Sequence, residues 1–167
     1  MTKEKNELNK ELNDVDVMSR TMAALFYFLA DEVINTYGED AVKVIKRAME
    51  RFGLHRGQKI REKVLHEGEQ LTLENLFKYY DMPLLKAWEM EAEDTPQKRV
   101  SCVSYCPMAV QWKELEGEEI GQLYCTVDPY LVQGYNPELS FWHEGTIPQG
   151  EKECKLVYDA CEQGNIK

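Results

Sequence analysis

Two stretches of this chain alternate apolar and polar residues on both sides of a turn, and this pattern constrains the fold more than any other feature. Residues 88–93 place Trp88, Met90 and Ala92 between glutamates, and the alternation resumes at 100–105 after a turn-forming segment at 94–97. Residues 139–143 and 154–158 repeat the arrangement around a turn at 148–150. Since strand side chains alternate between two faces, these stretches predict two hairpins and one antiparallel sheet of four strands.

The N-terminal half has helical spacing instead. Apolar residues recur at helical intervals from residue 15 to residue 34, and Gly38 is a suitable stop. A second helix is expected to begin at residues 39–40, whose acidic side chains suit its positive end. Gly53 and Gly57 interrupt this second helix, which indicates either close packing or a ligand near the backbone.

Shorter helices are expected before and after the first predicted hairpin. Thr72 is a good N-cap for a helix over residues 73–80, and Pro107 suits the first position of a helix that Gly117 closes. Residues 118–133 fit both a helix and a strand by the spacing of their apolar residues. The predicted fold class is therefore α+β, with N-terminal helices and a four-stranded antiparallel sheet.

Composition limits the classes of partner. The chain has 167 residues, which suits one domain over residues 15–167 after a flexible leader or solvated helix end at 1–14. Acidic residues number 30 against 20 basic ones, and the net charge of −10 argues against a nucleic-acid partner. The longest apolar stretch, at 22–30, is too short for a membrane span, so we expect a cytoplasmic protein. An odd number of cysteines, five, indicates free thiols in place of a disulfide framework.

Four of the five cysteines lie between residues 102 and 154, and one of them is a candidate nucleophile. Cys106 precedes Pro107 and is expected to be the N-cap of a helix, where free N–H groups and the helix dipole favour a thiolate. The alternative is a small apolar cap that packs under the sheet. Cys102 and Cys161 carry no comparable signal.

Two further residues are candidates for proton transfer. Asp128 lies three residues after Cys125, so both share one face if the segment is helical, although an Asp before Pro129 also suits a turn. His143 lies on the same strand face as apolar neighbours, which fits either a core histidine or a catalytic base. Cys106, Cys125 and Cys154 with a carboxylate or His143 could form a tetrahedral zinc site, but no Cys-x-x-Cys pair supports one.

Arg56 lies between the two helix glycines and is a candidate for substrate binding. A guanidinium held there could bind a carboxylate through two hydrogen bonds. The alternative is an ordinary surface arginine in a charged helix. The chain contains no nucleophile elbow, zinc-protease motif, phosphate loop or dinucleotide fingerprint, which excludes the commonest hydrolase and nucleotide-binding enzymes.

The order of these motifs resembles the L-2-amino-thiazoline-4-carboxylic acid hydrolase family. The resemblance spans residues 22–158 and includes the helix around Arg56, Cys-Pro at 106–107, Trp-Lys-Glu at 112–114, Tyr-Cys at 124–125, Gly-Tyr-Asn-Pro at 134–137 and the Gly-x-x-x-Cys strand at 150–154. The one departure is Glu151, where the family has Asp. More distantly, the chain is similar to the 4-vinyl-reductase-like and TRAPP-like ligand-binding fold. That relative often has a Cys where this chain has Ile147, so we expect no metal and no other cofactor.

The resemblance implies a hydrolase that opens a cyclic amidine ring to give a carbamoyl-cysteine, and it favours helix for residues 118–133. It implies catalytic roles for Cys106, Asp128 and His143. The implied substrate-binding residues are Arg56, Trp112, Cys125, Tyr135 and Asn136. The alternative is a non-catalytic domain that binds a small molecule or acts as an adaptor. The expected partner is a small molecule, with a homodimer as an option.

Overall fold

The computed structural model describes residues 3–83, 86–95 and 97–160, and Cys161 lies outside them. Three helices come first, and they are α1 (Lys3–Tyr37), α2 (Glu39–His66) and α3 (Leu73–Lys78). The first hairpin follows as β1 (Glu89–Asp94) and β2 (Lys98–Tyr105). The remaining elements are α4 (Pro107–Glu114), α5 (Glu118–Cys125), α6 (Val127–Tyr135), β3 (Ser140–Gly145), the 3-10 turn η2 (Ile147–Gln149) and β4 (Cys154–Asp159).

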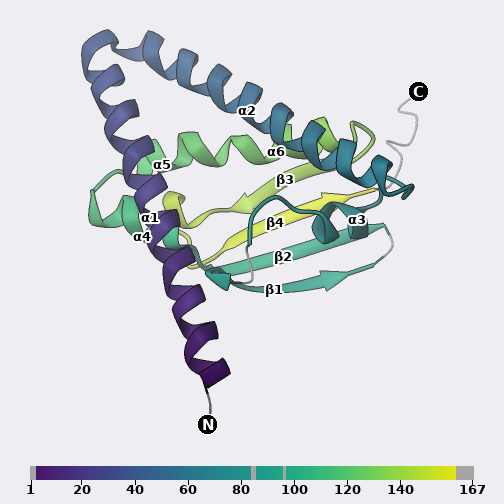
Figure 1. Ribbon diagram of the computed structural model, residues 1–167. Coiled ribbons are helices and arrows are strands. Elements are labelled where there is room, and N and C mark those ends of the chain that lie inside the picture. The colour runs from purple at the N-terminus through teal and green to yellow at the C-terminus, as the bar shows by residue number, and fades with distance from the viewer. Residues whose placement is uncertain (1–2, 84–85, 96, 161–167) are drawn as a thin grey trace, which may run out of the picture.

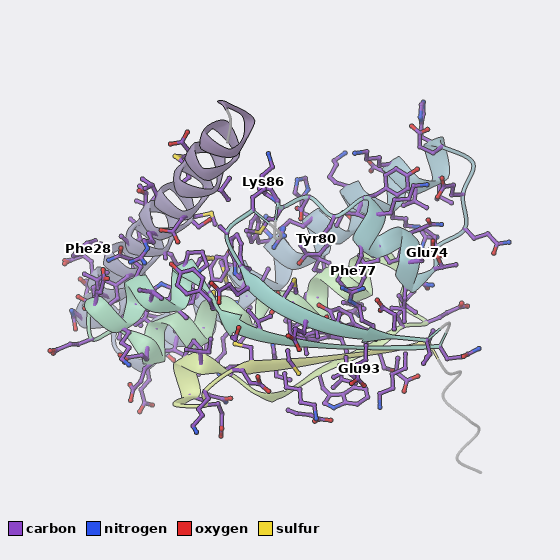
Figure 2. The ribbon with its side chains drawn as sticks, turned by 90° about the horizontal axis from the view of Figure 1, so that it is seen from below. Phe28, Glu74, Phe77, Tyr80, Lys86 and Glu93 are labelled. Carbon is purple, nitrogen blue, oxygen red and sulfur yellow. The ribbon has the colours of Figure 1, made fainter. Side chains whose placement is uncertain are left out.

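The sheet has four antiparallel strands in the order β1-β2-β4-β3, which confirms the predicted fold class. Val103 pairs with Cys154, and His143 pairs with Leu156. Because paired residues point to the same side, these residues share one face of the sheet. Tyr80 lies on this helix-covered side, whereas Glu93 lies on the other side (Figure 2).

The ambiguous segment at 118–133 forms two helices, α5 and α6, in agreement with the prediction. Figure 1 shows α6 running beside α2, and α6 also contacts β3. Val127, Leu131 and Val132 are almost fully buried along one side of α6. Their spacing of four and five residues places them on one helical face, so burial on that face selects helix over strand.

The glycines of α2 permit close contact between the helices. A Cβ added at Gly57 would overlap the carbonyl oxygen of Leu131, and one at Gly53 would overlap the carbonyl oxygen of Val127. On α6, Gly134 meets the backbone of Leu54 in the same way. The close-packing alternative for the two α2 glycines is therefore the one that the structure confirms.

Two apolar clusters form the core. The larger one joins α2, α3, α6 and β4, and its buried members are Ile60, Val64, Leu73, Leu76, Leu131, Val132, Tyr135 and Tyr158. The smaller one joins α1 to α4 through Ala23, Met108, Ala109 and Trp112. The space between these clusters holds the cavity described below.

The helix ends agree with the sequence prediction at Thr72 and differ from it after α4. Thr72 caps α3, and its hydroxyl accepts a hydrogen bond from the Asn75 N–H at 3.2 Å. Glu116, and not Gly117, has the left-handed backbone after α4, with φ of 53°. Residues 3–14 continue α1 as helix. None of the helices in the described ranges is long and apolar enough to cross a membrane.

Candidate active site

A cavity of about 120 Å³ lies between the helix-covered face of the sheet and the surrounding helices. Arg56 from α2, Cys106 from the start of α4 and Asp128 from α6 all line it, together with His143 from β3. Four candidates from four different parts of the chain therefore share one space. The other lining residues are Phe77, Tyr80, Met82, Trp88, Met90, Val103, Met108, Trp112, Tyr124, Cys125, Val127, Thr146, Cys154, Leu156 and Tyr158.

Asp128 and His143 form a pair within this cavity. Nε2 of His143 lies 3.1 Å from Oδ2 of Asp128, and both side chains are mostly buried, with 19% and 29% of their surfaces exposed. The ring of Phe141 lies edge-on to His143 at 4.9 Å and limits its rotation. A carboxylate that holds one imidazole nitrogen leaves the other nitrogen free to exchange a proton, so this pair can act as a general base.

Cys106 is the N-cap of α4, as predicted, but its thiol is not acidified. Burial raises the pKa of Cys106, and the charge of Asp128 raises it further. The N–H groups of Ala109 and Met108 and the indole of Trp88, whose Nε1 donates to Sγ at 3.2 Å, lower this pKa only in part. The prediction of a depressed pKa is therefore wrong, because burial opposes the charged form more strongly than the helix end favours it.

The other two cavity thiols are also held in the protonated form. Burial raises the pKa of Cys125 well above its usual range, and the charge of Asp128 adds to this effect. The pKa of Cys154 rises to about 11, again mainly through burial, although the Ile147 N–H donates to its Sγ at 3.2 Å. Within the described part of the chain, no group of three or more His, Cys, Asp or Glu side chains is arranged to hold a metal ion. The absence of zinc from purified protein stays a prediction.

Arg56 is already paired within the protein. Its Nε and Nη2 donate to the two carboxylate oxygens of Asp81 at 2.7 Å and 2.6 Å, and only 7% of Arg56 is exposed. The rings of Phe52 and Tyr80 lie 5.5 Å and 5.7 Å from the guanidinium carbon. Arg56 is thus no ordinary surface arginine. Asp81 binds the Nε–Nη2 edge of the fork and leaves the Nη1–Nη2 edge as the one that a ligand carboxylate could use.

Trp112 lines the cavity but its polar atom is used elsewhere. Its indole N–H donates to the carbonyl oxygen of Ala23 at 3.0 Å, and its ring packs on Gly121 so closely that no Cβ would fit there. Trp112 therefore fastens α1 to α4 and α5 and presents only ring surface to the cavity.

Tyr135 and Asn136 do not line the cavity. The Tyr135 hydroxyl donates to the carbonyl oxygen of Thr72 at 2.8 Å, and the Asn136 amide donates to the carbonyl oxygen of Leu71 at 3.0 Å. Asn136 also accepts a hydrogen bond from the Glu138 N–H at 3.0 Å. Both residues join the end of α6 to the loop before α3. They therefore stabilise the fold at a distance from the cavity that the other candidates line.

Sequence patterns assign no role to several residues in or beside the cavity. Asp81 lies between the lining residues Tyr80 and Met82, but it has no motif around it, and its partner Arg56 is 25 residues away. Tyr124 belongs to the Tyr-Cys motif, yet burial raises its pKa to about 12. Trp88 belongs to a strand pattern, although its indole contacts Cys106. The aromatic residues before Pro83 and around Cys125 are a sequence signal for this site.

Two solved structures have a similar fold. One is a trafficking protein particle complex subunit 3 from Naegleria fowleri covalently bound to palmitic acid, with 10% identity and a TM-score of 0.52 over 86% of this chain and 95% of that one. The other is the phenol-responsive sensory domain of the transcription activator PoxR with phenol, with 11% identity and a TM-score of 0.50 over 84% and 73%. These likenesses concern the fold alone and confirm the TRAPP-like prediction.

No curated protein matches the chain. The model of the family described as L-2-amino-thiazoline-4-carboxylic acid hydrolase matches residues 18–158. The matched range includes every residue of the cavity, and it covers most of the chain.

Proposed function

Because this chain belongs to the L-2-amino-thiazoline-4-carboxylic acid hydrolase family, we propose that its cavity is the active site of a hydrolase that opens a cyclic amidine ring. The observation that carries the proposal is the meeting of Arg56, Cys106 and the Asp128–His143 pair at one cavity. A cavity of about 120 Å³ has the right scale for one small ring, since an apolar cavity of about 150 Å³ holds benzene.

The proposed reaction adds water to the amidine carbon of 2-amino-thiazoline-4-carboxylate and breaks the bond from that carbon to the ring nitrogen. His143, oriented by Asp128, accepts a proton from the attacking water. The ring nitrogen takes up a proton as it leaves, and the product is a carbamoyl-cysteine with a free amino group. Water is the proposed nucleophile because burial keeps the Cys106 thiol protonated at neutral pH.

Cys106 and Arg56 have supporting roles in this scheme. A protonated thiol can donate its proton to the leaving ring nitrogen, and the Trp88 indole at 3.2 Å stabilises the sulfur while the proton is away. Arg56 binds the substrate carboxylate through its Nη1–Nη2 edge, and Asp81 holds the guanidinium in place. The proton that His143 accepted then passes to the Cys106 thiolate, which restores a neutral imidazole and a protonated thiol for the next turnover.

A binding domain without catalysis is the second candidate, and the lining of the cavity favours it. Most lining side chains are aromatic or apolar, including Phe77, Trp88, Met90, Val103 and Leu156. Such a lining suits a small apolar ring, and one similar fold is a sensory domain solved with phenol. In either case we propose a cytoplasmic protein that binds a small molecule.

Turnover separates the two candidates. The purified protein is incubated with 2-amino-thiazoline-4-carboxylate, and carbamoyl-cysteine is quantified by mass spectrometry while binding is followed by calorimetry. The hydrolase proposal predicts product, with a rate that falls about 10²-fold in Cys106→Ala and less in Cys106→Ser, which keeps a proton donor. Binding without product in the wild-type protein supports the binding domain and contradicts the hydrolase.

A further inference from the structure

The outer face of α1 carries large apolar side chains that nothing in the single chain covers. The exposed fractions are 52% for Val17, 68% for Met18, 38% for Met22, 60% for Leu25, 59% for Phe28 and 61% for Leu29. At 100° per residue, these six positions lie within an arc of about 140°, as wide as the stripe that a helix normally turns to its core. Phe28 lies at the edge of the molecule, away from the sheet (Figure 2).

The opposite face of the same helix already packs against its own chain. Ser19, Ala23 and Ala30 are the buried residues among the described side chains of α1, and Phe26 and Tyr27 pack on Tyr124 and Gly117. A surface helix in a monomer usually buries its large apolar residues and exposes polar ones. The second apolar face of α1 departs from this rule, and cover by another molecule explains it.

The apolar face continues onto α2. Phe52 is 39% exposed and lines a groove with Met22. The exposed parts of these seven side chains amount to roughly 650 Å², if each large apolar residue has a surface of about 150–200 Å². A stable dimer buries about 800 Å² on each partner, so this face with its polar rim is large enough for one.

We propose that a second copy of this chain covers this face, with the two α1 helices packed antiparallel about a twofold axis near residues 23 and 24. Met18 then lies opposite Leu29 of the other copy, and Met22 lies opposite Leu25. The intervals of four, three and four residues between these positions are those of a helix-helix seam. A twofold contact requires one patch to match itself, and this spacing is symmetric about its centre.

Sedimentation equilibrium of the full chain tests the proposal. The wild-type protein is expected to be a dimer at low micromolar concentration, and Leu25→Asp is expected to raise the dimer Kd at least tenfold with unchanged circular dichroism. Leu65→Asp is the matched control, because Leu65 is 51% exposed at the far end of α2 and should leave the dimer intact. A wild-type protein that stays monomeric at 50-fold higher concentration overturns the proposal and leaves the face to a different partner.

Discussion

The chemistry of single residues in the cavity depends on burial more than on local sequence. A helix N-terminus is worth about 0.3–1 kcal/mol to a nearby negative charge, up to about 2 kcal/mol in buried geometries. Removal of a charged group from water costs several kcal/mol, so burial decides the protonation state of Cys106. From the sequence, the N-cap position of Cys106 could be predicted, but the depth of the cavity around it could not.

Thiol reactivity tests this point directly. We expect Cys106, Cys125 and Cys154 to react slowly with iodoacetamide at pH 7.5, because the pKa of each is raised and the thiolate is scarce. Their alkylation should accelerate as the pH rises above 9, and peptide mass spectrometry can follow each site separately. Fast labelling of Cys106 at pH 7.5 would restore the interpretation of an activated thiolate.

For helices and strands, local sequence patterns predicted which elements form, but they did not predict which elements pack side by side. The alternation of apolar and polar residues located both hairpins, because side chains of consecutive strand residues point to opposite faces of the sheet. The insertion of β4 between β2 and β3 depends on contacts about 50 residues apart and leaves no local trace. The same limit applies to the site. Tyr135 and Asn136 belong to a recognisable motif, yet they hold the end of α6, whereas Asp81 has no motif and holds Arg56.

The contact between α2 and α6 gives a prediction at this scale. We expect Gly57→Ala to lower the free energy of unfolding by about 2 kcal/mol or more, because the added methyl would overlap backbone atoms of Leu131 and Tyr135. Thermal and urea denaturation measure the change. Gln58→Ala is the control at the exposed neighbouring position, and it should leave the stability nearly unchanged. A Gly57→Ala variant as stable as the wild-type protein would show that α2 and α6 can move apart at little cost.

For the whole molecule, the buried thiols and phenols tie stability to alkaline pH. Burial raises the pKa of Cys125, Tyr124 and Tyr158 and brings that of Cys154 to about 11, so the fold favours their neutral forms. Unfolded thiols ionise near pH 8.5, and the unfolded state therefore loses protons first as the pH rises. The contribution of these groups to the free energy of unfolding is therefore fully present below about pH 8.5. It is lost as the pH rises through their pKa values in the folded protein.

Urea denaturation at pH 7.5, 9 and 10.5 should therefore show a falling free energy of unfolding. Cys154→Ala should reduce this slope, because it removes one of the groups that ionise preferentially in the unfolded state. A stability that stays constant up to pH 10.5, or a slope that Cys154→Ala leaves unchanged, would mean that these groups are already hydrated in the folded protein.

We propose that the Asp128–His143 pair activates water for hydrolysis in the cavity, and the turnover of histidine variants tests this role. The rate of carbamoyl-cysteine formation from 2-amino-thiazoline-4-carboxylate is compared between the wild-type protein and the variants His143→Gln and His66→Gln. His66 serves as the control because its side chain is 86% exposed at the C-terminal end of α2. We predict a fall of about 10²–10⁴-fold in kcat for His143→Gln with unchanged circular dichroism, and no change for His66→Gln. Full activity in the His143→Gln variant would show that His143 does not activate the water.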